Sequence, residues 1–220
     1  MDKILIVSPH PDDETLGAGG TLLHYKSQNN KIYWLNITNV NIEYGYNEKK
    51  VEKRKEEIDE VIKKYGFDKF FDLALCPAKL QQYDSNEIIE KISNVIKEIE
   101  PTTIILPNST DVHSDHRIVF EWCYSCTKIF RYPHLRKILS MEILSETDFA
   151  VYENGFVPNY FIDISNEFNK KIEILKIYNS ELGKHPFPRS IEGIEALAKY
   201  RGISAGCKYA EAFKVIKIIE

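Results

Sequence analysis

The feature that most constrains the fold is an alternation of short apolar runs with longer amphipathic segments. Apolar runs rich in β-branched residues predict strands at 4–7, 32–37, 70–75 and 102–106. Helical spacing of apolar residues falls between them, at 21–26, at about 48–65 and from Asp84 to just before Pro101. Strands that alternate with helices form parallel sheets covered on both faces. We therefore predict an α/β, Rossmann-like fold with a mostly parallel sheet and helices on both faces.

The second half of the chain is less regular. It predicts strands at 138–143 and 160–164 and helices at 165–178 and 190–200. No repeat, low-complexity tract or linker divides the 220 residues, of which 43% are hydrophobic. We expect a single domain over residues 1–220, whose C-terminal half rims the active site.

Charge and apolar content exclude several classes of partner. The net charge is −4, and the acidic and basic residues are interleaved, so no footprint for nucleic acid is present. No segment approaches the ~20 apolar residues of a membrane span, and the apolar run near the N-terminus is too short for a signal peptide. We expect a cytoplasmic protein, with its oligomeric state open. The C-x-x-C pair Cys123 and Cys126 is interpreted as two packed thiols.

Histidines and carboxylates are concentrated in the two segments that follow the first and fourth strands, residues 8–14 and 107–116. In a parallel sheet both segments face the crevice at the carboxyl ends of the strands. A single such segment is also typical of a capped turn. Two of them at equivalent strand ends favour a metal site, because turns with histidine and carboxylate three residues apart can converge on one ion.

Three of these side chains are predicted to form a catalytic zinc site. His10 and Asp13 from the first segment, with His116 from the second, would give two imidazoles and one carboxylate and leave a position for water. Zinc lowers the pKa of its water to about 7, so that hydroxide can attack a carbonyl. Another divalent metal such as Fe²⁺ is an alternative. Asp12 adjoins the ligands and is assigned as the general base.

Hydrolysis of an amide also needs a donor near the carbonyl oxygen. His113 suits this role. Asp115 or Asp111 is expected to hold its ring and keep it protonated, since a neighbouring carboxylate raises the pKa of a histidine.

Two motifs carry a resemblance to a known family. Pro9-His10-Pro11-Asp12-Asp13-Glu14 with Gly17-Ala18-Gly19-Gly20-Thr21, and His113-Ser114-Asp115-His116, resemble the two signatures of the PIG-L/LmbE-like family. The second signature often has proline where this chain has Ser114, which touches no ligand. The similarity extends weakly to 54–57 and to the tail from Arg201 to Phe213.

The resemblance implies a Rossmann-like, metal-dependent deacetylase of N-acetylglucosamine-containing conjugates such as thiol precursors, glycolipids and antibiotic intermediates. It implies that His10, Asp13 and His116 bind zinc, that Asp12 is the base, and that His113 stabilises the oxyanion with Asp115 behind it. It also implies that Arg54 faces a small amino-sugar substrate. We add Glu14 and Asp111 to the substrate-binding set.

Other functions stay open at this stage. A hydrolase of a phosphoester, an ester or a different amide would use the same zinc and base, whereas a sugar-binding or regulatory module would need neither Asp12 nor His113. Gly17, Gly19 and Gly20 lack the spacing of a phosphate loop and indicate close packing between helix and strand.

The rim of the site is expected to select the substrate. Tyr44 and Tyr46, in the loop 38–47, could stack on a sugar. Arg189 could bind a substrate phosphate or simply belong to a structural loop. A sugar nucleotide, a glycolipid and a thiol conjugate all remain candidates.

Overall fold

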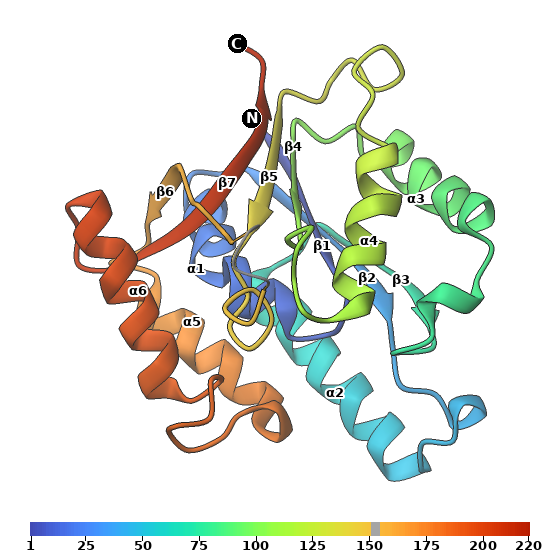
Figure 1. The fold of residues 1–220 in the computed structure, drawn as a ribbon, viewed down its shortest axis with the longest axis horizontal. Helices are drawn as coiled ribbons and strands as arrows, with labels where there is room; N and C mark the ends of the chain where they lie inside the picture. The colour runs from blue at the N-terminus through green and yellow to red at the C-terminus, as the bar shows by residue number, and fades with distance from the viewer. Residues whose placement is uncertain (151–154) are drawn as a thin grey trace.

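The computed structural model describes residues 1–150 and 155–220, and within them seven strands form one sheet in the order β3-β2-β1-β4-β5-β7-β6 (Figure 1). The strands are β1 (Lys3–Ser8), β2 (Lys31–Thr38), β3 (Lys69–Leu75), β4 (Thr103–Leu106), β5 (Lys137–Met141), β6 (Tyr160–Asp163) and β7 (Ala210–Ile218). β7 pairs antiparallel with β5 and β6, and the other pairings are parallel. The mostly parallel sheet is confirmed.

Helices cover both faces of this sheet, as predicted. They are α1 (Asp13–Ser27), α2 (Glu48–Tyr65), α3 (Ser85–Ile99), α4 (Ser114–Ser125), α5 (Phe168–Leu175) and α6 (Ile191–Ala205), with short 3₁₀ helices η1 (Ile42–Tyr44), η2 (Leu80–Gln82) and η4 (Lys176–Glu181). Figure 1 shows α3 and α4 on one side of the sheet and α1, α5 and α6 on the other. In the described ranges no helix has the length and apolarity that crossing a membrane requires.

Alternation along the central strands builds the two apolar cores. Ile4 and Ile6 of β1 join the core beneath α1, α2 and α5, whereas Leu5 and Val7 join the core beneath α3 and α4. Successive side chains of a strand point to opposite faces, so one fully apolar strand supplies both cores. Cys123 and Cys126 are buried in the second core, which agrees with packed thiols.

Three elements differ from the sequence prediction. Helix α1 begins at Asp13 rather than near Thr21, because its polar and glycine-rich first turns are buried and give no amphipathic pattern. The helix expected at 165–178 is divided between α5 and η4. Strand β7 was not predicted, although the carboxyl-terminal tail supplies the strand between β5 and β6.

The glycines of α1 allow close packing, as expected. A Cβ atom on Gly17 would lie 2.7 Å from Met141 Sδ, and one on Gly20 would lie 2.7 Å from Ile164 Cδ1. Met141 ends β5, and Ile164 follows β6. Helix α1 is also kinked at Ala18, where φ is −143°.

A buried ion pair forms hydrogen bonds with backbone N–H and C=O groups on both sides of this kink. Glu211 of β7 accepts the N–H groups of Gly20 and Thr21 at 2.9 and 2.7 Å. Lys171 of α5 donates to Glu211 at 2.6 Å and to the Leu16 carbonyl at 2.8 Å. Lys171 is 3% exposed and Glu211 6%. The pair therefore ties α1, which carries Asp13 at its first residue, to the C-terminal half of the chain.

Replacing Lys171 with Met should lower the free energy of unfolding by about 3–5 kcal/mol, because it leaves the buried Glu211 charge unpaired. Adding Glu211→Gln should recover part of this loss. Urea denaturation measures both. Lys199→Met is the matched control, since Lys199 is an exposed lysine that pairs with Glu195, and it should change stability little. Equal effects of Lys171→Met and Lys199→Met would contradict the assignment.

Candidate active site

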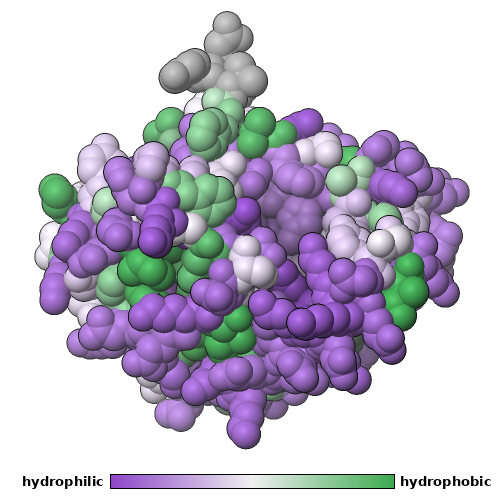
Figure 2. Space-filling model, turned by 90° about the horizontal axis from the view of Figure 1, so that it is seen from below, coloured by the Kyte–Doolittle hydropathy of each residue, from purple (hydrophilic) through white to green (hydrophobic). Residues whose placement is uncertain are grey.

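The predicted metal-binding segments meet where the strand order reverses. β1 lies between β2 and β4, and Ile6 is paired with Ile105, so the carboxyl ends of β1 and β4 open side by side. A cleft of about 270 Å³ lies there, lined by charged and polar side chains that include Asp12 and Asp13. Figure 2 looks onto this end of the molecule, which is mostly hydrophilic and hollowed near its middle.

The three predicted metal ligands converge. Asp13 Oδ2 lies 3.3 Å from His10 Nδ1 and 3.3 Å from His116 Nε2. Ligands on a tetrahedral zinc with bonds of ~2.0–2.1 Å are separated by roughly 3.4 Å. His116 Nε2 is buried and has no hydrogen-bond partner within the described ranges. These donor atoms therefore fit a divalent cation.

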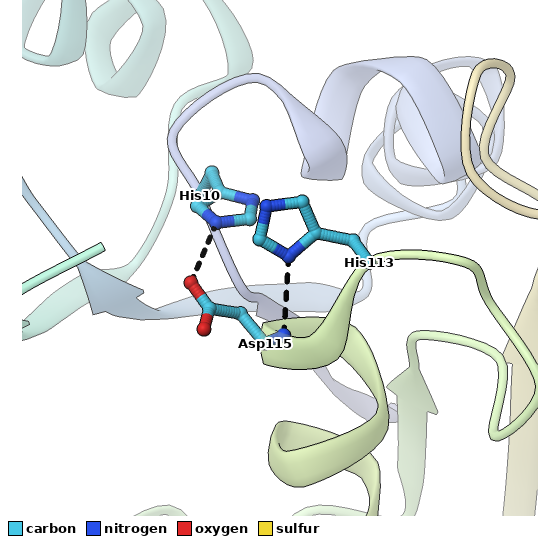
Figure 3. A group of neighbouring side chains, drawn as sticks. All are labelled: His10, His113 and Asp115. Atoms are coloured by element: carbon cyan, nitrogen blue, oxygen red, sulfur yellow. Dashed lines mark hydrogen bonds and ion pairs between the residues drawn. The ribbon is translucent and has the colours of Figure 1, made fainter. Parts of the chain in front are cut away.

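Each predicted ligand histidine is oriented by a carboxylate of its own. Asp111 Oδ2 lies 2.8 Å from His116 Nδ1, and Asp115 Oδ2 lies 3.1 Å from His10 Nε2 (Figure 3). A ring nitrogen that donates to a carboxylate leaves the lone pair of the other nitrogen for a metal. Asp111 also accepts from the Thr147 hydroxyl at 2.7 Å. Both carboxylates are therefore fixed in place.

Without a metal, the carboxylates favour protonated histidines. Burial opposes the cation of His10, but hydrogen bonds to Asp115 and Asp13 raise its pKa to about 9. Burial likewise opposes the cation of His116, but the charge of Asp13 and the bond to Asp111 raise its pKa to about 10. At neutral pH a divalent cation must therefore displace a proton from each ring, so metal affinity should rise with pH.

A second group of donors, His10, His113 and Asp115, is also compact enough to hold a metal. Two acceptor atoms of this group, Asp115 Oδ2 and His113 Nδ1, already take part in hydrogen bonds, however. Asp115 Oδ2 bonds to His10 Nε2 and accepts the Ala78 N–H at 2.7 Å, and the Asp115 backbone N–H donates to His113 Nδ1 at 3.1 Å (Figure 3). The group with Asp13 and His116 is the better metal site.

The prediction that Asp115 or Asp111 holds His113 in its protonated form is wrong. Those carboxylates bond to His10 and His116 instead. His113 Nδ1 accepts a backbone N–H, so the ring is neutral and carries its proton on Nε2. Burial and the positive charges of His10 and His116 lower the pKa of His113. His113 still lines the cleft, where Nε2 can act as a neutral donor.

Asp12 occupies a strained position in the wall of the cleft. It is 3% exposed, and its φ of 140° is rare outside glycine. Its N–H donates to Glu14 Oε2 at 3.0 Å, and its Oδ2 accepts from Arg189 Nη1 at 3.2 Å. Burial and the charge of Asp13 raise the pKa of Asp12, against the effect of Arg189. A carboxyl group of raised pKa beside a metal site is suited to proton transfer.

Two of the three predicted substrate-binding residues do not reach the cleft. Glu14 and Asp111 are fully buried, and their carboxylates hold the Asp12 backbone and His116 respectively, so direct substrate binding by them is a wrong prediction. Spacing alone cannot separate a residue that supports the site from one that contacts its ligand. Arg54 does line the cleft.

The rim was predicted only in part. Tyr46 lines the cleft, whereas the Tyr44 hydroxyl donates to the Ala74 carbonyl at 2.9 Å. The cleft also has residues that the sequence reading missed: Lys50, Pro77, Glu146 and Glu181. Pro77 follows β3 and could have been found from its place after a strand. The two glutamates lie outside regular α-helix and strand, so no periodic signal marks them.

Because Asp115 and Asp111 orient the ligand histidines, Asp115→Asn and Asp111→Asn should each weaken metal binding by about 10–100-fold. Competition with a chelator of known affinity measures the change. Glu87→Gln removes an exposed carboxylate on α3 and should leave the affinity unchanged. Wild-type affinity in both Asn variants would contradict this assignment.

Solved structures share this fold. The chain matches N,N′-diacetylchitobiose deacetylase from Pyrococcus horikoshii, complexed with its inhibitor MPG, with a TM-score of 0.77 and 18% identity over 98% of this chain and 84% of that one. It also matches GalB, the 4-carboxy-2-hydroxymuconate hydratase from Pseudomonas putida KT2440, with a TM-score of 0.76 and 14% identity over 100% and 99%. One fold thus carries two reactions, and the fold alone does not select between them.

The sequence comparisons are more specific. The chain is 24% identical over 234 residues to diacetylchitobiose deacetylase from Thermococcus kodakarensis, covering 98% of this chain and 84% of that protein. Residues 5–127, which contain both predicted metal-binding segments, match the PIG-L family. More than half of the chain is matched, and it therefore belongs to the PIG-L family, described as GlcNAc-PI de-N-acetylase.

Proposed function

We propose that the protein is a zinc-dependent N-deacetylase that hydrolyses the N-acetyl group of an N-acetylglucosamine-type conjugate to the free amine and acetate. The observation that carries the proposal is the convergence of His10, Asp13 and His116 at a cleft that also presents Asp12 and His113. Membership of the PIG-L family supports the reaction, and the diacetylchitobiose deacetylase relative supports a sugar substrate.

In the proposed mechanism one set of side chains holds the metal and a second set orients the metal ligands. His10, Asp13 and His116 hold the metal, and Asp115 and Asp111 keep the two rings oriented. When bound, zinc supplies a Lewis acid that polarises the acetyl carbonyl and acidifies water. Fe²⁺ would fit the same donors.

Proton transfer and charge stabilisation fall to two further residues. Asp12 accepts the proton of the attacking water and passes it to the departing amine nitrogen. His113 donates from Nε2 to the developing oxyanion, a role that a neutral ring can perform. The strained backbone at Asp12 supports a catalytic role, since strain is retained where function requires it.

The proposal includes a small substrate and one catalytic domain. Tyr46 at the cleft suits stacking on a sugar ring, and Arg54 lines the same cleft. β7 lies between β5 and β6 in the same sheet, which supports treating residues 1–220 as one unit. The same donors would also serve hydrolysis of another amide or ester, so substrate screening decides the class.

The test is acetate release from N-acetylated sugars, chitobiose conjugates and sugar nucleotides by the zinc-loaded protein. Asp12→Asn should keep its zinc and lose about 10²–10⁴ in kcat, the effect of a general base. His113→Ala should lose about 10²–10³, the effect of one oxyanion donor. His134→Ala, which removes an exposed histidine that pairs with Glu100 and does not line the cleft, is the matched control and should behave as wild type.

Two outcomes would contradict the proposal. One is a zinc-loaded wild type that releases acetate from none of these conjugates. The other is near-normal turnover by Asp12→Asn, which would move the base to another residue.

A further inference from the structure

Arg189 is the contact through which the C-terminal half of the chain reaches Asp12. Its Nη1 lies 3.2 Å from Asp12 Oδ2, across 177 residues of sequence. The next residue, Ser190, is fully buried and caps α6 by accepting the Gly193 N–H at 3.0 Å. The backbone that presents Arg189 is therefore anchored, although it lies outside regular secondary structure.

The surroundings of Asp12 are mainly acidic. The charges of Asp13, Glu181 and Glu14 all act on its carboxylate. Arg189 is the one cation in direct contact with it among the described residues. No hydrogen bond to Asp12 Oδ1 is found in the described ranges, so the two oxygens of this carboxylate are not equivalent.

Arg54, the other arginine that lines the cleft, does not contact the Asp12 carboxylate. Arg54 Nη1 donates to the Pro11 carbonyl at 2.8 Å, its Nη2 to Glu181, and its Nε lies 3.2 Å from Glu57. All three nitrogens of its guanidinium are thus engaged elsewhere. The Arg189 guanidinium stands over the Phe187 ring, 5.6 Å from its centroid, and contacts Asp12.

We propose that Arg189 is a positioning residue that fixes the Asp12 carboxylate for proton transfer. It holds Oδ2, which leaves Oδ1 as the oxygen that accepts the proton of water. The inference rests on the proposed function, in which Asp12 is the base. It gives the C-terminal half a part in assembling the base, in addition to rimming the cleft.

The experiment compares Arg189→Ala and Arg189→Lys with wild type, using the zinc-loaded full chain and a conjugate that the wild type deacetylates. Arg189→Ala should lower kcat by about 10–100-fold, with zinc content retained and KM within about threefold. Arg189→Lys should keep more activity, and added guanidinium should restore part of the kcat of Arg189→Ala. Arg131→Ala, which removes an arginine stacked on Phe130 outside the cleft, is the control.

A double variant separates positioning from an independent role. In an Asp12→Asn background, Arg189→Ala should cause little further loss, because Arg189 acts through Asp12. Circular dichroism and melting establish that each variant is folded. If Arg189→Ala does not fold, the Arg189→Lys variant and its own double variant with Asp12→Asn carry the same comparison.

Four results would overturn the inference. A raised KM with kcat unchanged would make Arg189 a substrate contact, and multiplicative losses in the double variant would make it independent of Asp12. Wild-type turnover by Arg189→Ala, when Asp12→Asn is inactive, would refute the inference alone. A wild type that hydrolyses no conjugate would refute the proposed function and this inference with it.

Discussion

The structure depends on the placement of the Asp13 carboxylate between two imidazoles, each of which is held by another buried carboxylate. Asp13, Asp111 and Asp115 together contribute three negative charges in a place where isolated charges are costly. Two protonated histidines supply two positive charges, and one divalent cation with neutral histidines supplies the same number. Exchange of two protons for one divalent cation would therefore leave the net charge of the cluster unchanged.

The fold serves this cluster by bringing two distant segments together. The reversal of strand order places the ends of β1 and β4 side by side, and α1 and α4 then begin at Asp13 and Ser114. The glycines of α1 let the helix approach the sheet closely. The Lys171–Glu211 pair forms hydrogen bonds with the backbone groups around the kink in α1. The C-terminal half thus supports α1, which carries Asp13, and also supplies Arg189 to the cleft.

Much of this could be predicted from the sequence, because buried parallel strands and the polar segments that follow them are local patterns. The parallel sheet, its helices and the convergence of His10, Asp13 and His116 were predicted on that basis. Strand β7 was missed because its antiparallel place in the sheet depends on the whole fold. The partners of Asp111 and Asp115 were misassigned because sequence spacing does not show which ring a carboxylate faces at the start of α4.

The most direct measurement is anomalous diffraction at the zinc edge from crystals of the zinc-loaded protein. We predict one zinc ion at ~2.0–2.2 Å from His10 Nδ1, Asp13 Oδ2 and His116 Nε2, with Asp115 still bonded to His10 Nε2. A zinc ion held instead by His10, His113 and Asp115, or three ligand side chains that point apart, would contradict it.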